Sequence, residues 1–286
     1  MIFITGGTGL VGSHILLKLS QDNIPFKALK RSTSSLKVCK DVFTHYKAEQ
    51  LFNSIIWETG DVNNIPSLED AMQNCDTIIH AAAMVSFNNE DANLMHKINV
   101  EGTENIMNVA LSMNIKKISY ISSIASLGRN STENMVDENC HFRVSKKESN
   151  YSLSKYYSEQ EVWRASQEGL DVVIINPSVI IGPGDWTKGS SQIFQRINKG
   201  LKFYTTGSTG YVDVVDVANC AIQLLLSDIK NERFIVNGAN MKFRTLFDLI
   251  AEGLGNKKST IKVTPLLKEI AWRAEWIRSF IVGKKP

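Results

Sequence analysis

The chain has 286 residues, of which 43% are apolar and 21% are charged, values close to the average of soluble globular proteins. This composition excludes a disordered chain, and no apolar run approaches the roughly 18 residues that a membrane-spanning helix needs. A net charge of +3 is too small to indicate a nucleic-acid-binding protein.

The N-terminal residues join the first apolar run directly. The sequence starts at Met1, and no charged leader or apolar segment could be cleaved without removing this first run itself, so we expect no export signal. Four cysteines lie far apart without CxxC spacing, which indicates neither a zinc site nor a disulfide framework: Cys39, Cys75, Cys140 and Cys220. We therefore expect a cytoplasmic protein without a metal site.

Short apolar runs alternate with helical patterns through much of the chain. The runs occupy residues 2–5, 26–29, 54–57, 77–80, 117–122 and 172–176, and the helical patterns about 10–20, 67–73, 90–113 and 151–168. The runs are continuous, as in parallel strands that helices cover on both faces. The sequence therefore predicts an α/β protein with a doubly wound parallel sheet of the Rossmann type.

A glycine-rich loop follows the first predicted strand, with Gly6, Gly9 and Gly12 at intervals of three. Such a loop lets the backbone approach a pyrophosphate, and the N-terminus of the next helix offers free N–H groups to the anion. The first interval is one residue wider than in the dinucleotide fingerprint, and a turn that only packs a helix on a sheet is the alternative. We expect Gly6, Gly9, Leu10 and Gly12 to bind a dinucleotide.

The second predicted strand ends in Lys30-Arg31-Ser32, where a carboxylate would bind the adenosine ribose of NAD. Two cations at this place favour the 2′-phosphate of NADP, because an arginine can bind a phosphate through two parallel hydrogen bonds. The alternative is a solvated basic turn. We expect NADP as the cofactor, with NAD the less favoured one.

The sequence "YSLSK" places Tyr151 and Lys155 four residues apart, on one face of a predicted helix. A phenol exchanges protons poorly at neutral pH, and a neighbouring ammonium stabilises the phenolate and lowers its pKa. Such a pair also arises by chance, but Ser122 and Ser123 follow a predicted strand at the sheet edge where open α/β sheets bind ligands. We expect a serine hydroxyl to bond the substrate oxygen while Tyr151 exchanges the proton, and Lys155 also suits the cofactor ribose.

The pattern changes after Pro177, where loops rich in Gly, Ser and Thr surround shorter elements. At roughly 100–200 residues per domain, the chain length also indicates two lobes. We expect a Rossmann domain over residues 1–176, to which residues 211–227 return, and a smaller C-terminal lobe over residues 177–286.

Several segments together resemble the extended short-chain dehydrogenase/reductase family, the NAD(P)-dependent epimerase/dehydratase group. The matching segments are "TGGTGLVGSH" (5–14), "GDV" (60–62), "DTIIHAAA" (76–83), "NVEGTENI" (99–106), "YISSIASLG" (120–128), "YSLSK" (151–155), "NPSVIIGPGD" (176–185) and "VDVVDVA" (212–218). The resemblance implies that residues 1–176 bind NAD(P) and that residues 177–286 bind the substrate.

The resemblance also implies roles for single positions. Ser123 resembles the family's catalytic serine or threonine, Tyr151 its acid/base and Lys155 the partner of that tyrosine. Other positions are implied to line the cofactor or to begin the long helix: Asp61 and Val62 beside the adenine, Ala81 and Ala82 along the cofactor, Pro177 near the nicotinamide, and Asn99 at the helix start. We expect His80, Ser122 and Asp216 to shape the fold rather than to react.

Three departures from the sugar-nucleotide members favour a reductase. Thr209 and Gly210 stand where those members carry an Arg-Asp pair, and the Lys-Arg pair suits exchangeable NADPH. Met84, Val85 and Phe87 are expected to give the substrate an apolar lining. These features resemble the dihydroflavonol-reductase and hydroxysteroid-dehydrogenase branch, and they predict hydride transfer between NADP(H) and a carbonyl or alcohol. The alternatives are a nucleotide-sugar epimerase or dehydratase with tightly bound NAD, and a cofactor-sensing binding protein.

The C-terminal segment 257–286 carries eight lysines and arginines against two glutamates. Its apolar residues recur at helical spacing, which predicts a helix that either covers the substrate lobe or touches a membrane surface through residues 265–282. Family members commonly continue beyond this point, and the sequence leaves open whether the native chain extends past Pro286. A homodimer through helices 90–113 and 151–168 would resemble the family.

Overall fold

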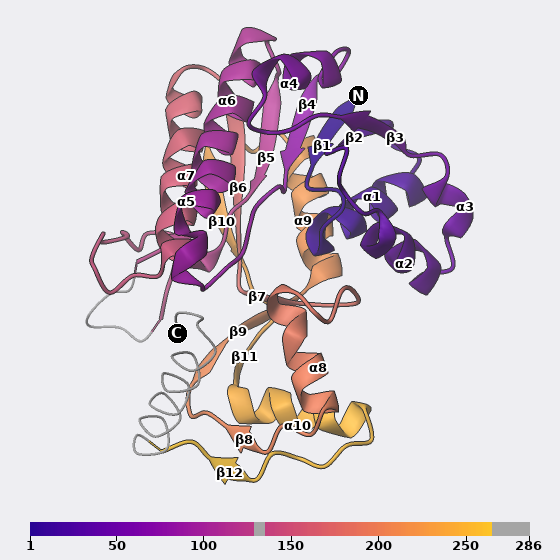
Figure 1. Ribbon diagram of the computed structural model, residues 1–286. Coiled ribbons are helices and arrows are strands. Elements are labelled where there is room, and N and C mark those ends of the chain that lie inside the picture. Colours follow the sequence, from indigo (N-terminus) through magenta and orange to yellow (C-terminus); the bar gives the residue numbers. More distant parts are fainter. Residues whose placement is uncertain (129–134, 265–286) are drawn as a thin grey trace. The chain divides into compact units, whose positions relative to one another are not determined.

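The computed structural model describes residues 1–128 and 135–264 (Figure 1). They form two compact units. The first unit holds Met1–Ser191 and Tyr211–Ala239, and the second holds Gln192–Gly210 and the chain from Asn240 onward. All residues that the sequence singles out for catalysis or cofactor binding lie in the first unit.

A seven-stranded parallel sheet forms the first unit's centre, with the order β10-β6-β5-β4-β1-β2-β3. The strand order reverses beside β1, which pairs with β2 on one side and with β4 on the other. The strands are β1 (Ile2–Thr5), β2 (Phe26–Lys30), β3 (Ile56–Thr59), β4 (Thr77–His80), β5 (Lys117–Ile121), β6 (Asp171–Pro177) and β10 (Glu232–Val236). This topology confirms the predicted Rossmann-type fold.

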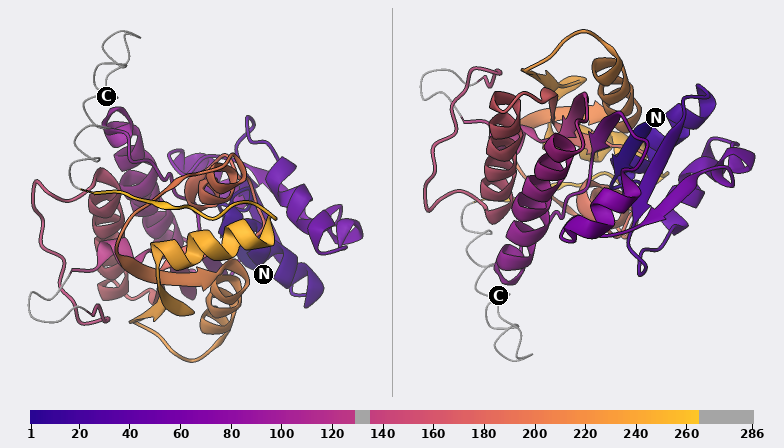
Figure 2. Two further views of the ribbon diagram at one scale, coloured as in Figure 1. Left: turned by 90° about the horizontal axis from the view of Figure 1, so that it is seen from below. Right: turned by 90° about the horizontal axis from the view of Figure 1, so that it is seen from above.

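Helices cover both faces of the sheet (Figures 1 and 2). Ile4 of β1 faces a core that it shares with α1 (Leu10–Gln21), α2 (Lys37–His45) and α9 (Val214–Leu226). Phe3 faces the opposite core, shared with α4 (Ile65–Ala71), α6 (Gly102–Ser112) and α7 (Asn150–Gln167). Because neighbouring strand residues point to opposite faces, the continuous apolar runs serve both cores.

The predicted long helix at 90–113 consists of several pieces. A 3₁₀ turn (Asn89–Asp91) and α5 (Ala92–His96) lead into a π-helical turn, Lys97–Glu101, before α6 begins at Gly102. The predicted strand at 54–57 lies at Ile56–Thr59, and α2 and the short α3 (Glu49–Phe52) were not predicted. Hydrogen bonds in a π-helical turn join residues five apart, whereas those in an α-helix join residues four apart. The turn therefore changes which side chains of this segment face the sheet.

The boundary between the units differs from the sequence expectation. Residues 177–191 and 211–239 lie in the first unit, whereas we expected 177–210 and the chain after 227 in the second lobe. The physical reason is strand pairing. β7 (Val179–Ile181) pairs in parallel with residues 211–213 of β9 (Ser208–Asp213), and β10 extends the central sheet beside β6.

The second unit is small. Helix α8 (Gln192–Asn198) contacts α10 (Phe243–Gly253), which follows β11 (Ala239–Lys242), and the short strands β8 (Phe203–Tyr204) and β12 (Ile261–Lys262) pair in parallel. Helix α10 buries one apolar face through Leu246, Phe247 and Ile250. The predicted C-terminal helix and its membrane contact at 265–282 lie outside the described residues.

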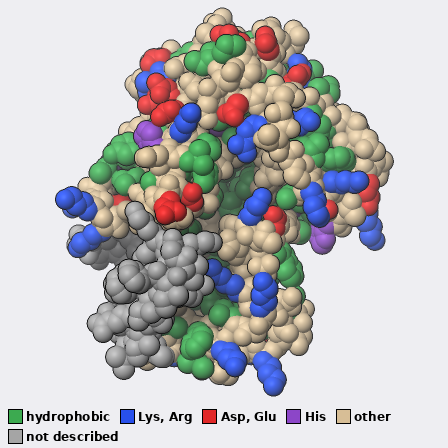
Figure 3. All heavy atoms as spheres, viewed as in Figure 1, with side chains coloured by type: hydrophobic (Ala, Val, Ile, Leu, Met, Phe, Trp, Pro, Cys, Tyr) green, Lys and Arg blue, Asp and Glu red, His purple; other side chains and the backbone are tan. Residues whose placement is uncertain are grey.

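The described residues were compared with two expectations from the sequence, the absence of a membrane-spanning helix and a small net charge. No helix of residues 1–128 and 135–264 is long and apolar enough to cross a membrane. On the face of the first unit shown in Figure 3, lysine and arginine side chains are interspersed with acidic ones. The charge pattern of that face therefore matches the small net charge of the chain.

A buried chain of hydrogen bonds joins β1, β4 and α6 at the carboxyl edge of the sheet. His80 is fully buried, with Nδ1 2.6 Å from Thr5 Oγ1 and Nε2 3.0 Å from Thr103 Oγ1. Thr103 donates its only hydroxyl proton to the Asn99 carbonyl, so Nε2 carries the histidine proton and Nδ1 accepts from Thr5. Thr5 Oγ1 in turn accepts from the Ala82 N–H at 3.2 Å. The hydrogen bonds therefore run in one direction, from the Ala82 N–H to the Asn99 carbonyl.

Burial, reinforced by the nearby Lys155 ammonium, lowers the pKa of His80 from 6.5 to about 3. Below pH 6.5 the unfolded chain takes up a proton that the folded chain refuses until about pH 3. His80 therefore does not reduce the stability above pH 6.5. As the pH falls below 6.5, this residue lowers the free energy of unfolding by up to about 1.4 kcal/mol per pH unit.

We predict that His80→Gln makes the stability less dependent on pH, because glutamine has no proton to take up. The measurement is the free energy of unfolding in urea at several values between about pH 7 and pH 5. His96→Gln, at an exposed position of α5, is the matched control and should leave the slope at its wild-type value. Equal slopes for wild type and His80→Gln would contradict the prediction.

Candidate active site

The glycine loop brings two backbone segments into direct contact. Gly6 has φ of +74°, and a Cβ there would lie 2.5 Å from the Ala81 carbonyl carbon. A Cβ at Gly12 would lie 2.1 Å from the Gly6 oxygen, so neither position accepts a side chain without movement. The Gly9 N–H donates to the Gly6 carbonyl at 2.9 Å, and Ser13 Oγ donates to the Gly9 carbonyl at 2.6 Å. The loop is thus a tight backbone cradle at the start of α1.

The cradle lies where the strand order reverses. β1 and β4 are neighbours, and their carboxyl ends carry the loop and Ala81-Ala82 respectively. The Ala81 N–H donates to the Thr5 carbonyl at 3.3 Å, which holds the two ends together. Open α/β sheets bind ligands at such a reversal, and a helix N-terminus attracts anions. A dinucleotide pyrophosphate therefore fits the backbone cradle at Gly6 and Gly12.

The predicted adenine side of the site follows β2 and β3. Lys30 ends β2 half-buried, and Arg31 is exposed, with its N–H donating to Ser34 Oγ at 3.2 Å. The Gly60 N–H donates to the Lys30 carbonyl at 3.0 Å, which places Asp61 beside this basic pair. The two predicted groups are therefore neighbours at one edge of the sheet.

Val62 is held by α6. Its carbonyl accepts from Asn105 Nδ2 at 3.0 Å, and its side chain packs where a Cβ at Gly102 would be, 2.7 Å from Val62 Cγ2. Asp61 Oδ1 accepts from the Asn63 N–H at 2.9 Å. These contacts fix the backbone of residues 61–63, and the Val62 side chain packs against α6.

Asn99, from the π-helical turn, holds the segment that follows β4. Its amide group makes two bonds with the Met84 backbone: Oδ1 accepts from the N–H at 2.7 Å, and Nδ2 donates to the carbonyl at 2.9 Å. Nδ2 also donates to Ser154 Oγ of α7 at 2.9 Å. Asn99 therefore joins three segments, and it aligns the apolar residues after Met84 with the first turns of α7.

Lys155 is a buried ammonium, 2% exposed. Its Nζ donates to the Tyr120 hydroxyl at 2.9 Å and to the Ile121 carbonyl at 2.8 Å, at the end of β5. The pKa of Lys155 is lowered, because the effect of burial outweighs the opposing effect of the charges of Tyr151 and Glu159. The ammonium thus joins α7, which also carries Tyr151, to the end of β5, which Ser122 and Ser123 follow.

Tyr151 lies in the first turn of α7, which Ser149 caps by accepting from the Ser152 N–H at 3.0 Å. Its ring packs edge to face against Phe87, with the ring centres 5.9 Å apart. Phe87 is 78% exposed and Val85 is 50% exposed, whereas Met84 is half-buried. The predicted apolar lining therefore includes an exposed aromatic ring in contact with the predicted acid/base.

Ser123 follows β5 and caps a 3₁₀ turn, Ile124–Ser126, that packs against α7. Its Oγ accepts from the Ala125 N–H at 3.1 Å, so the hydroxyl proton remains to be donated. Ser122, in contrast, donates to Glu159 Oε2 at 2.6 Å and is committed to the interior. Of the two adjacent serines, Ser123 is therefore the one whose hydroxyl proton is not already donated to Glu159.

Sequence reasoning missed three groups beneath this site: Tyr120, Glu159 and Arg233. Glu159 is 1% exposed and pairs with Arg233 at 3.0 Å. A signal existed for Glu159, because residues 151, 155 and 159 share one helix face and a carboxylate there needs a partner. Pro177, predicted near the nicotinamide, is buried at the end of β6 and pairs with Val236 of β10.

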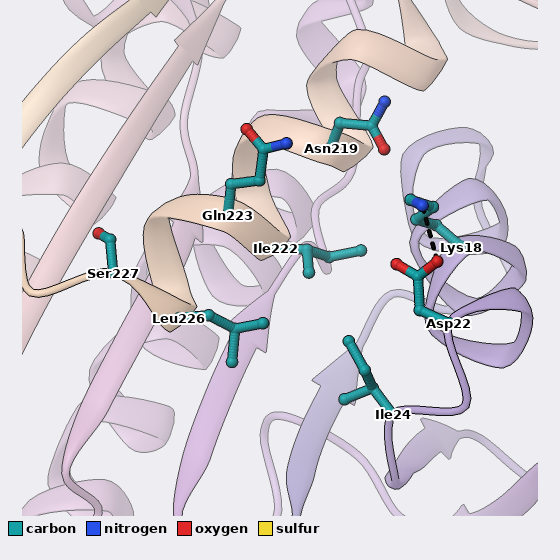
Figure 4. Close-up of a pocket in the computed structure, with 8 residues that line it drawn as sticks. All are labelled: Lys18, Asp22, Ile24, Asn219, Ile222, Gln223, Leu226 and Ser227. Atoms are coloured by element: carbon teal, nitrogen blue, oxygen red, sulfur yellow. Dashed lines mark hydrogen bonds and ion pairs between the residues drawn. The ribbon is translucent and has the colours of Figure 1, made fainter.

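A separate pocket of about 350 Å³ lies between the C-terminal halves of α1 and α9 (Figure 4). It is lined by Lys18, Asp22, Ile24, Asn219, Ile222, Gln223, Leu226 and Ser227. The glycine cradle is at the opposite end of α1, so this pocket contains no residue of the candidate site. In residues 1–128 and 135–264, no group of three His, Cys, Asp or Glu side chains could hold a metal ion.

We compared the chain with family models, with curated proteins and with solved structures. The NAD dependent epimerase/dehydratase family matches residues 2–237. A putative dihydroflavonol 4-reductase from Synechocystis sp. is 34% identical over 219 residues, which cover 76% of this chain and 60% of that protein. Sterol demethylase protein B from Methylococcus capsulatus is 26% identical over 93% of this chain and 78% of its own length. The crystal structure of gox2253 superposes with a TM-score of 0.80 at 29% identity, and covers 100% of this chain and 84% of its own.

We predict that Gly12→Ala weakens dinucleotide binding at least tenfold, because the new methyl group would meet the Gly6 oxygen and open the cradle. Affinity for NADPH and NADH can be measured by the fluorescence of the reduced nicotinamide. Gly253→Ala, at a helical position with open space, is the control and should bind as wild type does. Wild-type affinity in Gly12→Ala would show that the cofactor does not use this cradle.

Proposed function

Because the chain belongs to the NAD-dependent epimerase/dehydratase family, we propose that it is an oxidoreductase that transfers a hydride between NADP(H) and a carbonyl or alcohol substrate. The observation that supports the proposal is that buried Lys155, on the helix whose first turn carries Tyr151, donates to the Ile121 carbonyl two residues before Ser123. The chain spans 60% of the length of the Synechocystis relative, and the activity is proposed for this chain on its own residues.

The proton chemistry is assigned to three side chains. Ser123 accepts from a backbone N–H, and we assign its hydroxyl proton to the substrate oxygen, where it polarises the C–O bond. Tyr151 gives the oxygen its proton in reduction and removes it in oxidation. Lys155 is assigned as the partner of Tyr151, four residues away on the same helix. The bound nicotinamide supplies or accepts the hydride.

The cofactor is assigned to the edge that carries the glycine cradle. Backbone N–H groups at the start of α1 face the pyrophosphate, and Lys155 has a third N–H for the ribose beyond its two bonds inside the fold. The full set of proposed cofactor residues is Gly6, Gly9, Leu10, Gly12, Lys30, Arg31, Asp61, Val62, Ala81, Ala82, Lys155 and Pro177.

We propose an apolar substrate. An exposed phenylalanine costs free energy in water, and contact with an apolar ligand would remove that cost. Phe87 lies against Tyr151, so a ring system held by Phe87 would bring a carbonyl to the proton donor. The names of the Synechocystis and Methylococcus relatives refer to a dihydroflavonol and a sterol, both of which contain fused rings.

We predict that Tyr151→Phe keeps NADPH affinity but lowers kcat at least about 100-fold, because only the proton path is removed. The assay follows NADPH oxidation with dihydroquercetin, cinnamaldehyde, a 3-ketosteroid and phenanthrenequinone, beside an epimerisation assay with UDP-glucose. Tyr157→Phe, an exposed tyrosine on the same helix, is the control and should turn over normally. Unchanged turnover in Tyr151→Phe would refute its role, and epimerisation of UDP-glucose would favour the alternative function.

We predict that Arg31→Ala weakens NADPH binding about 10- to 100-fold, which corresponds to one lost charged hydrogen bond of about 1.5–3 kcal/mol. Binding of NADH, which lacks the 2′-phosphate, should be almost unaffected. The control is Lys40→Ala, an exposed cation of α2. Wild-type protein that binds NADH as tightly as NADPH would contradict the proposed preference.

A further inference from the structure

Glu159 is a buried carboxylate that the proposed chemistry does not use. Its side chain is 2% exposed, and burying a charge is costly unless the charge is paired and hydrogen-bonded. Oε2 accepts from Ser122 Oγ at 2.6 Å, Ser126 Oγ at 2.7 Å and Asn176 Nδ2 at 2.9 Å. Oε1 accepts from Arg233 Nη1 at 3.0 Å. Four donors from three separate parts of the chain therefore meet on one carboxylate.

The donors on Oε2 surround the backbone of Ser123. Asn176 Nδ2 has two protons, which reach Glu159 Oε2 and the Ser123 carbonyl, the latter at 3.1 Å. Ser126 Oγ lies 2.7 Å from both the same carboxylate oxygen and the Ser123 carbonyl. Because Ser126 has a single hydroxyl proton, it can donate to only one of these two oxygens. The side chain that bonds the Ser123 carbonyl and Glu159 together is therefore Asn176.

Arg233 extends the network to a neighbouring loop. Its Nε donates to the Glu138 carbonyl at 2.8 Å, and the Ile235 N–H donates to Glu138 Oε1 at 2.8 Å. The same loop touches the segment after Ser123, because a Cβ at Gly128 would lie 1.8 Å from the His141 oxygen. The backbone of residues 123–128 is therefore held from both ends.

We propose that Glu159 and Arg233 are positioning residues that act on turnover through Ser123. The inference rests on the proposed function, in which Ser123 donates to the substrate oxygen. A serine hydroxyl can rotate, so its direction depends on the backbone that carries it and on the Ala125 N–H that it accepts. The Glu159 carboxylate fixes that backbone by accepting one proton of Asn176 Nδ2, whose other proton bonds the Ser123 carbonyl.

Glu159→Gln tests the proposal with almost no change of shape. An amide has one accepting oxygen and one donating nitrogen, so it cannot accept on both sides. Either Arg233 or the Ser122, Ser126 and Asn176 donors then face an N–H₂ group. We expect kcat for dihydroquercetin reduction to fall about 100-fold, as for a displacement of about 1 Å at a reacting group, with NADPH affinity unchanged.

The matched control is Glu168→Gln. Glu168 directly follows α7, pairs with Arg164 at 2.9 Å, and has a side chain that is 49% exposed. This variant should leave kcat and NADPH affinity unchanged. Arg233→Lys, which keeps the charge opposite Glu159, should retain more turnover than Arg233→Met. Where Glu159→Gln fails to fold, this lysine-methionine pair carries the same test.

A double-mutant cycle with Ser123→Ala separates positioning from a merely structural role. If Glu159 acts through Ser123, Glu159→Gln should cost little further turnover once the Ser123 hydroxyl is gone. A full additive loss in the Ser123→Ala background would overturn the proposal, because it would mean that Glu159 acts through Lys155 or through general stability. Hydrogen exchange should rise in residues 122–128 of Glu159→Gln and stay unchanged in the glycine loop.

The outcomes distinguish this proposal from the proposed function. Wild-type protein that reduces no carbonyl of the panel, or turnover that survives in Ser123→Ala, would overturn both. Turnover that Ser123→Ala reduces but Glu159→Gln leaves at the wild-type level would overturn only the positioning role. The proposed function would then stand with Ser123 held by other contacts.

Discussion

The active-site half of the first unit depends on two buried charges of opposite sign, one turn apart on α7. The Lys155 ammonium and the Glu159 carboxylate both lie within the fold, and each is costly there without partners. Lys155 finds its partners at the end of β5, and Glu159 finds them around β6, β10 and the 3₁₀ turn. Because their partners are backbone and side-chain groups of these strand ends, the charges fix α7 in one register.

The polar edge contrasts with the apolar body of the sheet. Two separate cores hold the strands between their helices, while the carboxyl ends carry hydrogen-bonded side chains such as His80 and Asn176, and Asn99 of the π-helical turn bonds a loop that leaves the sheet. Asn99 and Asn176 bond backbone groups of loops that leave the sheet, and His80 reaches such a loop through Thr5. These polar side chains therefore hold the loops that would meet a ligand, and they also lie between those loops and the apolar cores.

Much of the fold was predictable from local patterns. Glycine spacing, continuous apolar runs and the Tyr151–Lys155 interval depend on neighbours in sequence, and they placed the cradle, the sheet and the paired face of α7. The pairings of Lys155 with Tyr120 and of Glu159 with Arg233 join residues 35 and 74 positions apart. Such pairings depend on tertiary packing, which periodicity does not encode. The same limit explains the misplaced boundary, since β7 pairs with β9 across an intervening segment.

The π-helical turn at Lys97–Glu101 makes segment length a constraint in its own right. Deleting one residue there would restore regular α-helical winding and change which residue lies opposite Met84. Asn99 would then leave Met84, although every residue of the site would still be encoded. Outward-facing positions of the turn, such as Lys97, can change chemically without this effect. A deletion in this segment would therefore disturb the site more than a substitution at one of its outward-facing positions.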